Sequence, residues 1–323
     1  MLNQPRPDEW PIATCLHGVP TKSADGRELH DAAPEAWAEA LALVRGVDFD
    51  LIELSDSHAR IGDMDSVRRS ELKSVLSDAG VEAPVVHIQR KSVIQPGAGA
   101  ENLAYAHRTI DAAADWGMQL VSTGLHQPLT PRQRDALWFW TEPGAKDPDD
   151  RETWDLAVAR LRQLGKHAAE VGLQLSLEMY EDTYLGTAEG AIRLVEEIGL
   201  PNVGINPDVG NLVRLHRPVD DWLDCYARTL PFANYWHVKN YLRDESPAHG
   251  TYASFPSTLE NGVINYRQVI ADAVRAGFTG IFLMEHYGGD SLGVCATNRD
   301  YVRKVLARSV TRSTAGATEP ALR

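Results

Sequence analysis

Short apolar runs alternate with longer amphipathic segments along the whole chain. The apolar runs that predict strands are, in order, Ile12–Leu16, Phe49–Leu54, Pro84–Gln89, Gln119–Gly124, Leu173–Glu178, Val203–Asn206, Phe232–Val238 and Gly280–Met284. Segments with helical periodicity follow them, near residues 34–46, 64–79, 101–116, 152–171, 187–199, 218–229, 265–276 and 297–309. Eight such strand–helix units predict an α/β fold of the (β/α)8, or TIM barrel, type.

Boundary signals in the sequence agree with these helices. Pro34 opens the first helical segment, and Gly172, Gly199 and Gly277 follow the ends of later ones. The structural alternative is a doubly wound open sheet, which usually carries a glycine-rich phosphate-binding turn, and the sequence has none. We therefore expect a single barrel domain over residues 1–311. The small, polar segment 312–323 is expected to be a disordered tail.

Two segments are longer than a minimal barrel needs. Thr130–Trp154 follows the fourth predicted strand, and Tyr241–Asn265 follows the seventh. Both leave the carboxyl ends of strands, where barrel enzymes build their pockets. Aromatic faces pack against sugar rings and flat polyphenols, so Trp138 and Trp140 in the first insertion are candidate substrate contacts. A plug over the barrel and a protein interface are the alternative interpretations of these tryptophans.

Four predicted strands end in side chains that are costly to bury alone. Glu178, Asp208, His237 and Glu285 follow the fifth to the eighth strands in succession. Consecutive barrel strands lie side by side, so the four side chains are expected to converge. Three carboxylates and one imidazole, without a thiolate, favour one divalent cation, Mn²⁺, with Mg²⁺ and Co²⁺ as alternatives. The other interpretation is a set of buried ion pairs and capping carboxylates.

Further polar side chains lie at the same end of the predicted barrel. His17, His87 and His126 occur at or just beyond strands one, three and four, and Lys239 points the same way as His237. A metal centre of this kind can work together with a general base, for which His126 is the preferred separate candidate. His17, His87 and Lys239 are candidate substrate contacts. Core histidines with satisfied hydrogen bonds, and a lysine paired with a neighbouring acid, are the alternatives.

Composition narrows the class of protein. The formal net charge of −13 disfavours nucleic acid as a partner, because binding phosphates needs a cationic surface. The three cysteines are far apart and form no CxxC pair, so a reducing compartment fits best. The N-terminus lacks the features of a signal peptide, and no apolar run approaches the roughly 20 residues needed to cross a bilayer. These features predict a cytoplasmic protein without a membrane partner.

The polar strand ends also carry a family resemblance. LSLEMY, NPDVGN, WHVKN and LMEH resemble the strand ends of the xylose-isomerase-like barrel family, over about Ile12 to Val305. That family includes sugar and sugar-phosphate isomerases, ketose 3-epimerases and inosose dehydratases. The resemblance implies one divalent cation, usually manganese, that holds two oxygens of a polyol or keto-sugar while a proton moves between carbons. In the epimerases two metal-bound glutamates also serve as acid and base, a role implied here for Glu178 and Glu285.

A finer resemblance concerns the substrate. GLHQ after the fourth strand, the WFW insertion, WHVKNY and MEHYGGD are most similar to the α subunit of bacterial C-glycoside deglycosidases. This implies a 3-oxo-C-glucoside of a flavonoid or similar phenol, whose C2 proton is removed and whose aglycone leaves C1 by β-elimination. It also implies a carbon–carbon lyase assembled with a small β subunit.

Other functions stay open at this point. The main alternative is a stand-alone sugar isomerase or ketose 3-epimerase that uses the same metal and the two glutamates. The DNA-repair endonucleases of the same superfamily use several metals and a basic face, which the net charge disfavours. A barrel that only binds sugars or a protein partner, without catalysis, is the last alternative.

Overall fold

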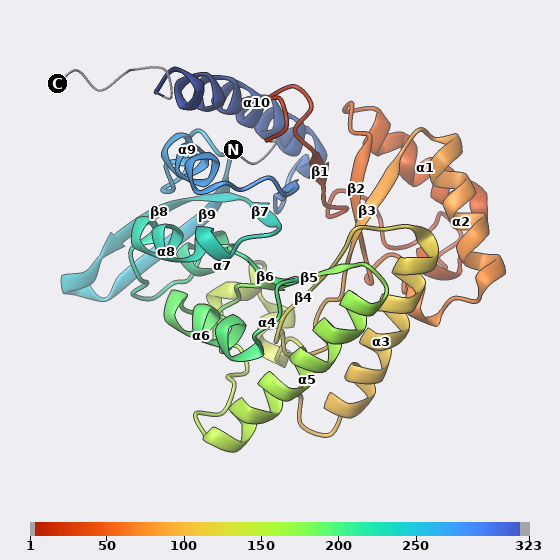
Figure 1. The fold of residues 1–323 in the computed structure, drawn as a ribbon, viewed down its shortest axis with the longest axis horizontal. Helices are drawn as coiled ribbons and strands as arrows, with labels where there is room; N and C mark the ends of the chain where they lie inside the picture. The colour runs from red at the N-terminus through yellow and green to blue at the C-terminus, as the bar shows by residue number, and fades with distance from the viewer. Residues whose placement is uncertain (1–3, 317–323) are drawn as a thin grey trace.

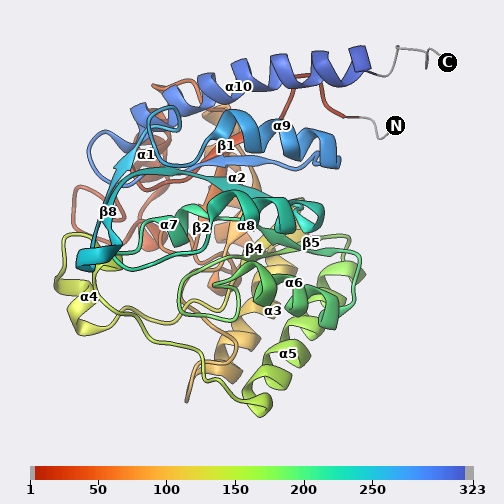
Figure 2. The same cartoon turned by 90° about the vertical axis from the view of Figure 1, so that its left-hand side faces the viewer.

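Eight parallel strands form the centre of the computed structural model, which describes residues 4–316. The strands are β1 (Ile12–Thr14), β2 (Leu51–Ser55), β3 (Glu82–His87), β4 (Leu120–Thr123), β5 (Gln174–Glu178), β6 (Val203–Asn206), β7 (Trp236–Val238) and β10 (Phe282–Met284). Their order in the sheet is β6-β5-β4-β3-β2-β1-β10-β7, so each strand lies beside its neighbours in the chain. Helices surround the strands (Figure 1 and Figure 2). The predicted TIM barrel is confirmed.

The helices follow the predicted segments closely. The long ones are α1 (Pro34–Arg45), α2 (Ser66–Asp78), α3 (Gly99–Trp116), α5 (Arg151–Glu170), α6 (Ala188–Ile198), α8 (Trp222–Thr229), α9 (Tyr266–Ala276) and α10 (Ser291–Gly316). Single turns of 3-10 helix are η1 (Leu29–Asp31), η2 (Ile61–Asp63), η4 (Leu230–Phe232) and η5 (Pro247–His249). Helix α10 begins before the predicted position and includes residues 312–316, which were expected to belong to a disordered tail. The rest of that predicted tail, 317–323, lies outside the described residues.

The two insertions adopt different structures. The first contains a short helix, α4 (Pro131–Asp135), and a turn of 3-10 helix, η3 (Phe139–Thr141). The second forms an antiparallel ribbon of β8 (Asn240–Ser246) and β9 (Thr251–Ser257), which projects from the barrel in Figure 1. A further short helix, α7 (Gly210–Val213), follows β6 directly.

The interior of the barrel changes from apolar to polar along the strands. Its apolar part is a separate cluster of buried side chains that includes Ala13, Val85, Leu120, Tyr235 and Leu283. Side chains two residues apart in a strand point to the same face. The next inward positions are therefore His87 after Val85, His237 after Tyr235, and Glu285 after Leu283. This periodicity places an apolar floor beneath a polar mouth at the carboxyl ends of the strands.

The barrel closes between β6 and β7 largely through side chains. The backbone contributes an isolated parallel bridge and one hydrogen bond, from Asn234 N to Ile205 O at 3.3 Å. Further along the seam, the N–H of His237 donates to the side-chain oxygen of Asn206 at 2.8 Å. Asn234 also donates through its side chain to Leu175 O on β5, 3.0 Å away. It can cross β6 because Gly204 has no side chain: a Cβ there would lie 2.5 Å from Asn234 Cγ.

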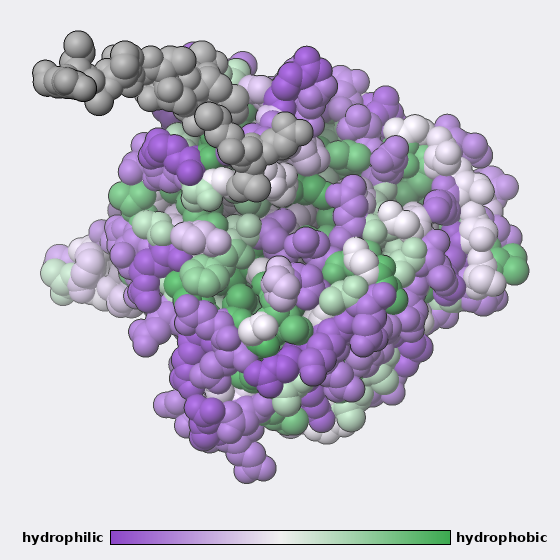
Figure 3. Space-filling model, viewed as in Figure 1, coloured by the Kyte–Doolittle hydropathy of each residue, from purple (hydrophilic) through white to green (hydrophobic). Residues whose placement is uncertain are grey.

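The surface of the protein is largely hydrophilic on the face that Figure 3 shows. Apolar side chains lie on this face in separate patches. Among the described residues, no helix combines the length and the hydrophobicity needed to cross a membrane.

A substitution at the seam tests this account of closure. Gly204→Ala is expected to destabilise the protein by about 1–3 kcal/mol, because the new methyl group would displace the Asn234 side chain. Urea unfolding measures the change in free energy. The same substitution in an Asn234→Ala background should cost clearly less, since the colliding group is then gone. Equal costs in the two backgrounds would show that Asn234 does not occupy this space.

Candidate metal centre

The four predicted ligands lie together at the polar mouth of the barrel. His237 Nδ1 is 3.2 Å from Glu285 Oε2, and it is 3.7 Å from both Glu178 Oε1 and Asp208 Oδ2. All four side chains are buried. Atoms that bind one ion at about 2.1 Å lie about 3 Å or slightly more from one another. The distances from His237 Nδ1 therefore suit ligands of a single ion, with Glu178, Asp208 and His237 as the set whose ligand atoms all lie near one another.

The donor atoms also fit a divalent cation by their chemistry. Asp208 Oδ1 and His237 Nδ1 are buried and make no hydrogen bond to any described residue. Unpartnered buried polar atoms are unusual and require an explanation. Ligand atoms of Glu178, Asp208 and His237 all lie within 4.8 Å of one another. A carboxylate-rich set with one imidazole suits Mg²⁺ or Mn²⁺ better than a structural zinc ion.

The carboxylates of the cluster act on one another as well as on Lys239. Lys239 donates to Asp208 Oδ2 at 2.5 Å and to Glu285 Oε2 at 2.7 Å. Even so, burial, reinforced by the Glu285 and Glu178 carboxylates, raises the pKa of Asp208 to about 7. Binding a cation favours the charged form of such a carboxylate. Pairing of Lys239 with neighbouring acids, which was the alternative to its prediction as a substrate contact, is what the structure contains.

Glu53, which the strand-end pattern did not single out, orients His237. It lies on β2, is 2% exposed, and accepts hydrogen bonds from His237 Nε2 at 3.0 Å and from Tyr235 Oη at 2.8 Å. Although burial opposes protonation of His237, the Glu53 and Glu178 carboxylates raise the pKa of its imidazole well above the usual range. A cation at Nδ1 would take the place of a proton there, while Nε2 keeps its hydrogen bond to Glu53. Although burial alone would raise the pKa of Glu53, the two neighbouring imidazoles, of His237 and His87, lower it below its usual range.

Two of the candidate histidines contact Glu178. His87 Nε2 lies 3.2 Å and His126 Nε2 lies 3.4 Å from Glu178 Oε2, while Asn211 donates to the other oxygen, Oε1, at 2.8 Å. Burial opposes ionisation of Glu178, but the histidines lower its pKa to about 2. Burial lowers the pKa of His126 to about 3. Near neutral pH, Glu178 is therefore a carboxylate and His126 a neutral imidazole.

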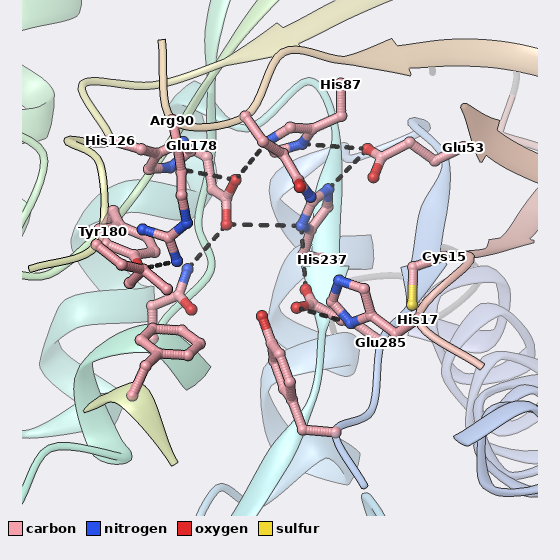
Figure 4. A pocket seen from close by; sticks show the side chains of 15 residues that line it. Cys15, His17, Glu53, His87, Arg90, His126, Glu178, Tyr180, His237 and Glu285 are labelled. Atoms are coloured by element: carbon pink, nitrogen blue, oxygen red, sulfur yellow. Dashed lines mark hydrogen bonds and ion pairs between the residues drawn. The ribbon is translucent and has the colours of Figure 1, made fainter. Parts of the chain in front are cut away.

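The third candidate histidine lies on the opposite side of the centre. His17 Nδ1 is 3.8 Å from Glu285 Oε1, and its ring packs against Tyr287 with 4.6 Å between ring centres. Figure 4 shows Glu178 and His126 on one side of His237, and Glu285 and His17 on the other. The two glutamates thus approach the centre from different sides.

A cavity of about 200 Å³ opens above the centre. Predicted site residues on its wall are His17, His87, His126, Glu178, His237 and Glu285. Residues that were not predicted also line it, namely Cys15, Glu53, Gln89, Arg90, Leu129, Tyr180, Asn211 and Tyr287. Pockets for drug-sized ligands usually measure about 300–1,000 Å³, so this cavity has the size of a small sugar.

The tryptophans of the first insertion lie behind the cavity wall. Trp138 and Trp140 stack on each other with ring centres 5.0 Å apart, and Trp140 also packs against Tyr287 at 5.3 Å. The insertion contributes Phe139 to the cavity wall, and neither tryptophan is part of that wall. Trp140 therefore supports Phe139 and Tyr287, and Trp138 supports Trp140. Lys239, another predicted substrate contact, is also not part of that wall and is buried against Asp208 and Glu285.

Comparison with known proteins identifies the family. The family model of the xylose isomerase-like TIM barrel matches residues 41–308, which is most of the chain. This chain belongs to the xylose isomerase-like TIM barrel family. A crystal structure of a xylose isomerase-like TIM barrel protein from Mycobacterium smegmatis, in complex with magnesium, is 44% identical. It has a TM-score of 0.90 and covers 95% of this chain and 99% of its own.

Less similar proteins have named activities. L-ribulose-5-phosphate 3-epimerase UlaE from Salmonella paratyphi A is 20% identical over 289 residues, which is 86% of this chain and 92% of that protein. The structure of an L-ribulose 3-epimerase is 17% identical, with a TM-score of 0.66 over 97% of this chain and 100% of its own. A D-allulose 3-epimerase from Methylomonas sp. is 14% identical, with a TM-score of 0.60 and coverages of 97% and 99%. At these identities, the two structures show that the fold is shared.

Removal of a ligand tests the metal centre. Asp208→Asn and Glu178→Gln are each expected to abolish retention of a divalent ion, because each removes a charged donor of a small set. Elemental analysis after dialysis, and the rise in melting temperature on adding Mg²⁺ or Mn²⁺, measure this. An ion at about 100 times its Kd stabilises a protein by about 2.7 kcal/mol, and this stabilisation should be absent in both variants. Glu189→Gln, an exposed carboxylate on α6, is the control and should bind metal as the natural protein does.

A second variant tests the role of Glu53. Glu53→Gln is expected to weaken metal binding by about 10- to 100-fold, since the carboxylate that orients His237 is replaced by a neutral amide. Calorimetric titration with Mn²⁺ measures the affinity. Tyr235→Phe is the matched control, because it removes the other hydrogen bond to Glu53 but leaves the bond from His237. An equal loss in both variants would indicate general destabilisation of the barrel floor instead of an effect on His237.

Proposed function

We propose that this protein is a metal-dependent isomerase or 3-epimerase of a small keto-sugar. The observation that supports this most directly is the placement of two glutamates, Glu178 and Glu285, on different sides of one candidate metal centre beneath a small cavity. Epimerisation next to a carbonyl needs a base on one face of the sugar and an acid on the other. This pair supplies both.

The proposed chemistry assigns a role to each contact in the centre. Glu178, Asp208, His237 and Glu285 would hold a divalent cation, which would supply Lewis-acid stabilisation of the charge that develops on the sugar oxygens. Glu178 Oε2 would take the proton from the carbon beside the carbonyl. His87 and His126 contact this same oxygen and would hold it in place. Glu285, which would have to carry a proton on Oε1 at the start of the reaction, would deliver that proton to the other face, beside His17, and Glu178 would keep the proton it removed.

Further side chains on the cavity wall would assist the proton transfer. His126 is a neutral imidazole on the cavity wall, so it can donate or accept a hydrogen bond and stays a candidate for a separate base. Phe139 and Tyr287, backed by Trp140, would exclude water from the reacting carbon.

The relatives support the same class of reaction. The named proteins are 3-epimerases of L-ribulose 5-phosphate, L-ribulose and D-allulose, and the M. smegmatis protein binds magnesium. We infer that a five- or six-carbon ketose is the substrate and that Mg²⁺ or Mn²⁺ is the metal. A complex with a second kind of subunit is not needed for this chemistry.

Cleavage of 3-oxo-C-glucosides is the second candidate function. The motifs that resemble the deglycosidase α subunit support it, and so does the general chemistry, because it also starts with loss of a proton beside a carbonyl. The size of the cavity favours the epimerase, since about 200 Å³ is small for a substrate that carries a flavonoid aglycone.

Hydrogen exchange at the reacting carbon tests the proposed function. With Mg²⁺ or Mn²⁺ in D₂O, the protein is expected to convert a ketose to its C3 epimer and to introduce deuterium at C3, as measured by NMR. L-Ribulose, L-ribulose 5-phosphate, D-allulose and D-fructose form the first panel of substrates. Failure to exchange the C3 proton or to isomerise any of them, in the metal-loaded protein, would contradict the proposal. Release of the aglycone from a 3-oxo-C-glucoside would instead support the second candidate.

Variants in which one glutamate is replaced test whether each glutamate acts on a different face of the sugar. In metal-loaded Glu285→Gln, the epimer whose C3 proton faces Glu178 should still exchange that proton, while its epimerisation falls by about 10²- to 10⁴-fold. Glu178→Gln should show the converse with the other epimer. Metal content is measured in parallel, because both residues are also proposed ligands. Parallel loss of exchange and epimerisation in variants that retain metal would contradict the assignment of one glutamate to each face.

A further inference from the structure

Arg90 brings a positive charge to the wall of the cavity. It follows β3 and lines the cavity together with Tyr180 and Phe139. In Figure 4 it lies on the side of Glu178 and His126. No described carboxylate forms an ion pair with it. Arg90 is partly buried, whereas two fully buried cations near the cavity are paired: Arg214 with Glu181, and Lys239 with Asp208 and Glu285.

The guanidinium of Arg90 is held in a defined position. Nη1 donates to Gln127 O at 3.2 Å, and Nη2 donates to Tyr180 Oη at 3.0 Å. The guanidinium carbon lies 5.0 Å from the centre of the Phe139 ring and 5.7 Å from that of Tyr180. A guanidinium has five N–H donors, so these contacts leave others available to a ligand. Arg90 is thus ordered before any ligand arrives.

The backbone at Arg90 is strained. Its φ angle is 50°, in the left-handed region that residues other than glycine rarely adopt. Such strain concentrates at ligand sites, where the surrounding structure holds a side chain in place. The next residue, Lys91, pairs with Asp56 instead of facing the cavity. At this strained turn the two adjacent cationic side chains point in different directions: Lys91 towards Asp56 and Arg90 towards the cavity.

A chain of contacts connects Arg90 to Glu178 of the candidate metal centre. His126 contacts Glu178, the His126 ring packs on Tyr180 with 4.4 Å between ring centres, and Tyr180 Oη accepts from Arg90. A sugar whose carbonyl end lies against Glu178 would extend along this wall towards the guanidinium.

We propose that Arg90 binds an anionic group at the far end of the sugar, so that the substrate is a ketose phosphate or a keto-sugar acid. This inference rests on the proposed function and specifies its substrate class. Arginine forms paired, charge-assisted hydrogen bonds with both phosphate and carboxylate. Without such a group, the cavity would hold an unpaired cation against a neutral sugar.

Binding of unreactive polyols tests the proposal without turnover. Ribitol, ribitol 5-phosphate and D-ribonate have the same carbon chain and differ in their terminal group. Titration calorimetry with the Mg²⁺-loaded protein should show that one anionic probe binds at least about 10- to 100-fold more tightly than ribitol. A preference for ribitol 5-phosphate identifies a phosphate, and a preference for D-ribonate identifies a carboxylate. Equal affinity for all three would overturn the proposal.

Variants assign the preference to Arg90. Arg90→Gln should reduce the ratio of the affinities for the anionic probe and ribitol to near one, and Arg90→Lys should retain part of it. Arg132→Gln removes the same charge from an exposed ion pair on α4, so it should keep the full ratio. A structural role for Arg90 would instead weaken both probes equally, which would contradict the proposal.

The same variants separate this inference from the proposed function. In the exchange assay, the ratio of kcat/KM for L-ribulose 5-phosphate to that for L-ribulose, and for D-fructuronate to that for D-fructose, should show the same dependence on Arg90. If the binding preference is present but no ketose reacts, the proposed function fails and the anion site stands. If ketoses react but neutral and anionic ones do so equally well, the anion site fails alone.

Discussion

The structure depends on how it compensates negative charge buried at the mouth of an apolar barrel. Glu53, Glu178, Asp208 and Glu285 are each at most 5% exposed, and the described side chains offer them one lysine and several histidines. Burial of so many carboxylates is costly unless positive charge lies close by. The orientation of His237, the pairing of Lys239 and the raised pKa of Asp208 all follow from this burial of carboxylates. A divalent cation would complete the compensation, and the same charge would serve the proposed proton transfer.

Much of this arrangement is predictable from the sequence because it follows from the periodicity of strands. An apolar run that ends in an acid or a histidine marks both the strand and its carboxyl end, and in a barrel these ends meet. That reasoning gives the fold and the positions of Glu178, Asp208, His237 and Glu285.

Glu53 has the same signature inside LIELS, and its inward direction follows from Leu51 and Ser55 by the period of two. Its role depends on Tyr235 and His237, which are distant in sequence, so no local pattern shows it.

The insertions and the far wall of the cavity are less predictable, because their structure depends on long-range packing. An aromatic triplet indicates a contact with a ring, but it does not tell which of Trp138, Phe139 and Trp140 faces the cavity. The orientation of the triplet depends on Gly288, against which Trp138 packs. A Cβ on Gly288 would lie 2.6 Å from the Trp138 indole. Arg90 is similar: a basic pair after a strand is common, and only the fold shows that Lys91 meets Asp56 while Arg90 lines the cavity.

The central claim is that one divalent ion binds through His237 and the three carboxylates around it. Pulsed electron paramagnetic resonance of the Mn²⁺-loaded protein tests this directly, because a directly bound imidazole gives a characteristic nitrogen coupling. The account predicts one Mn²⁺ per chain, a coupling to one imidazole nitrogen, and loss of that coupling in His237→Gln. No tightly bound Mn²⁺, or coupling to an imidazole that persists in His237→Gln, would contradict it.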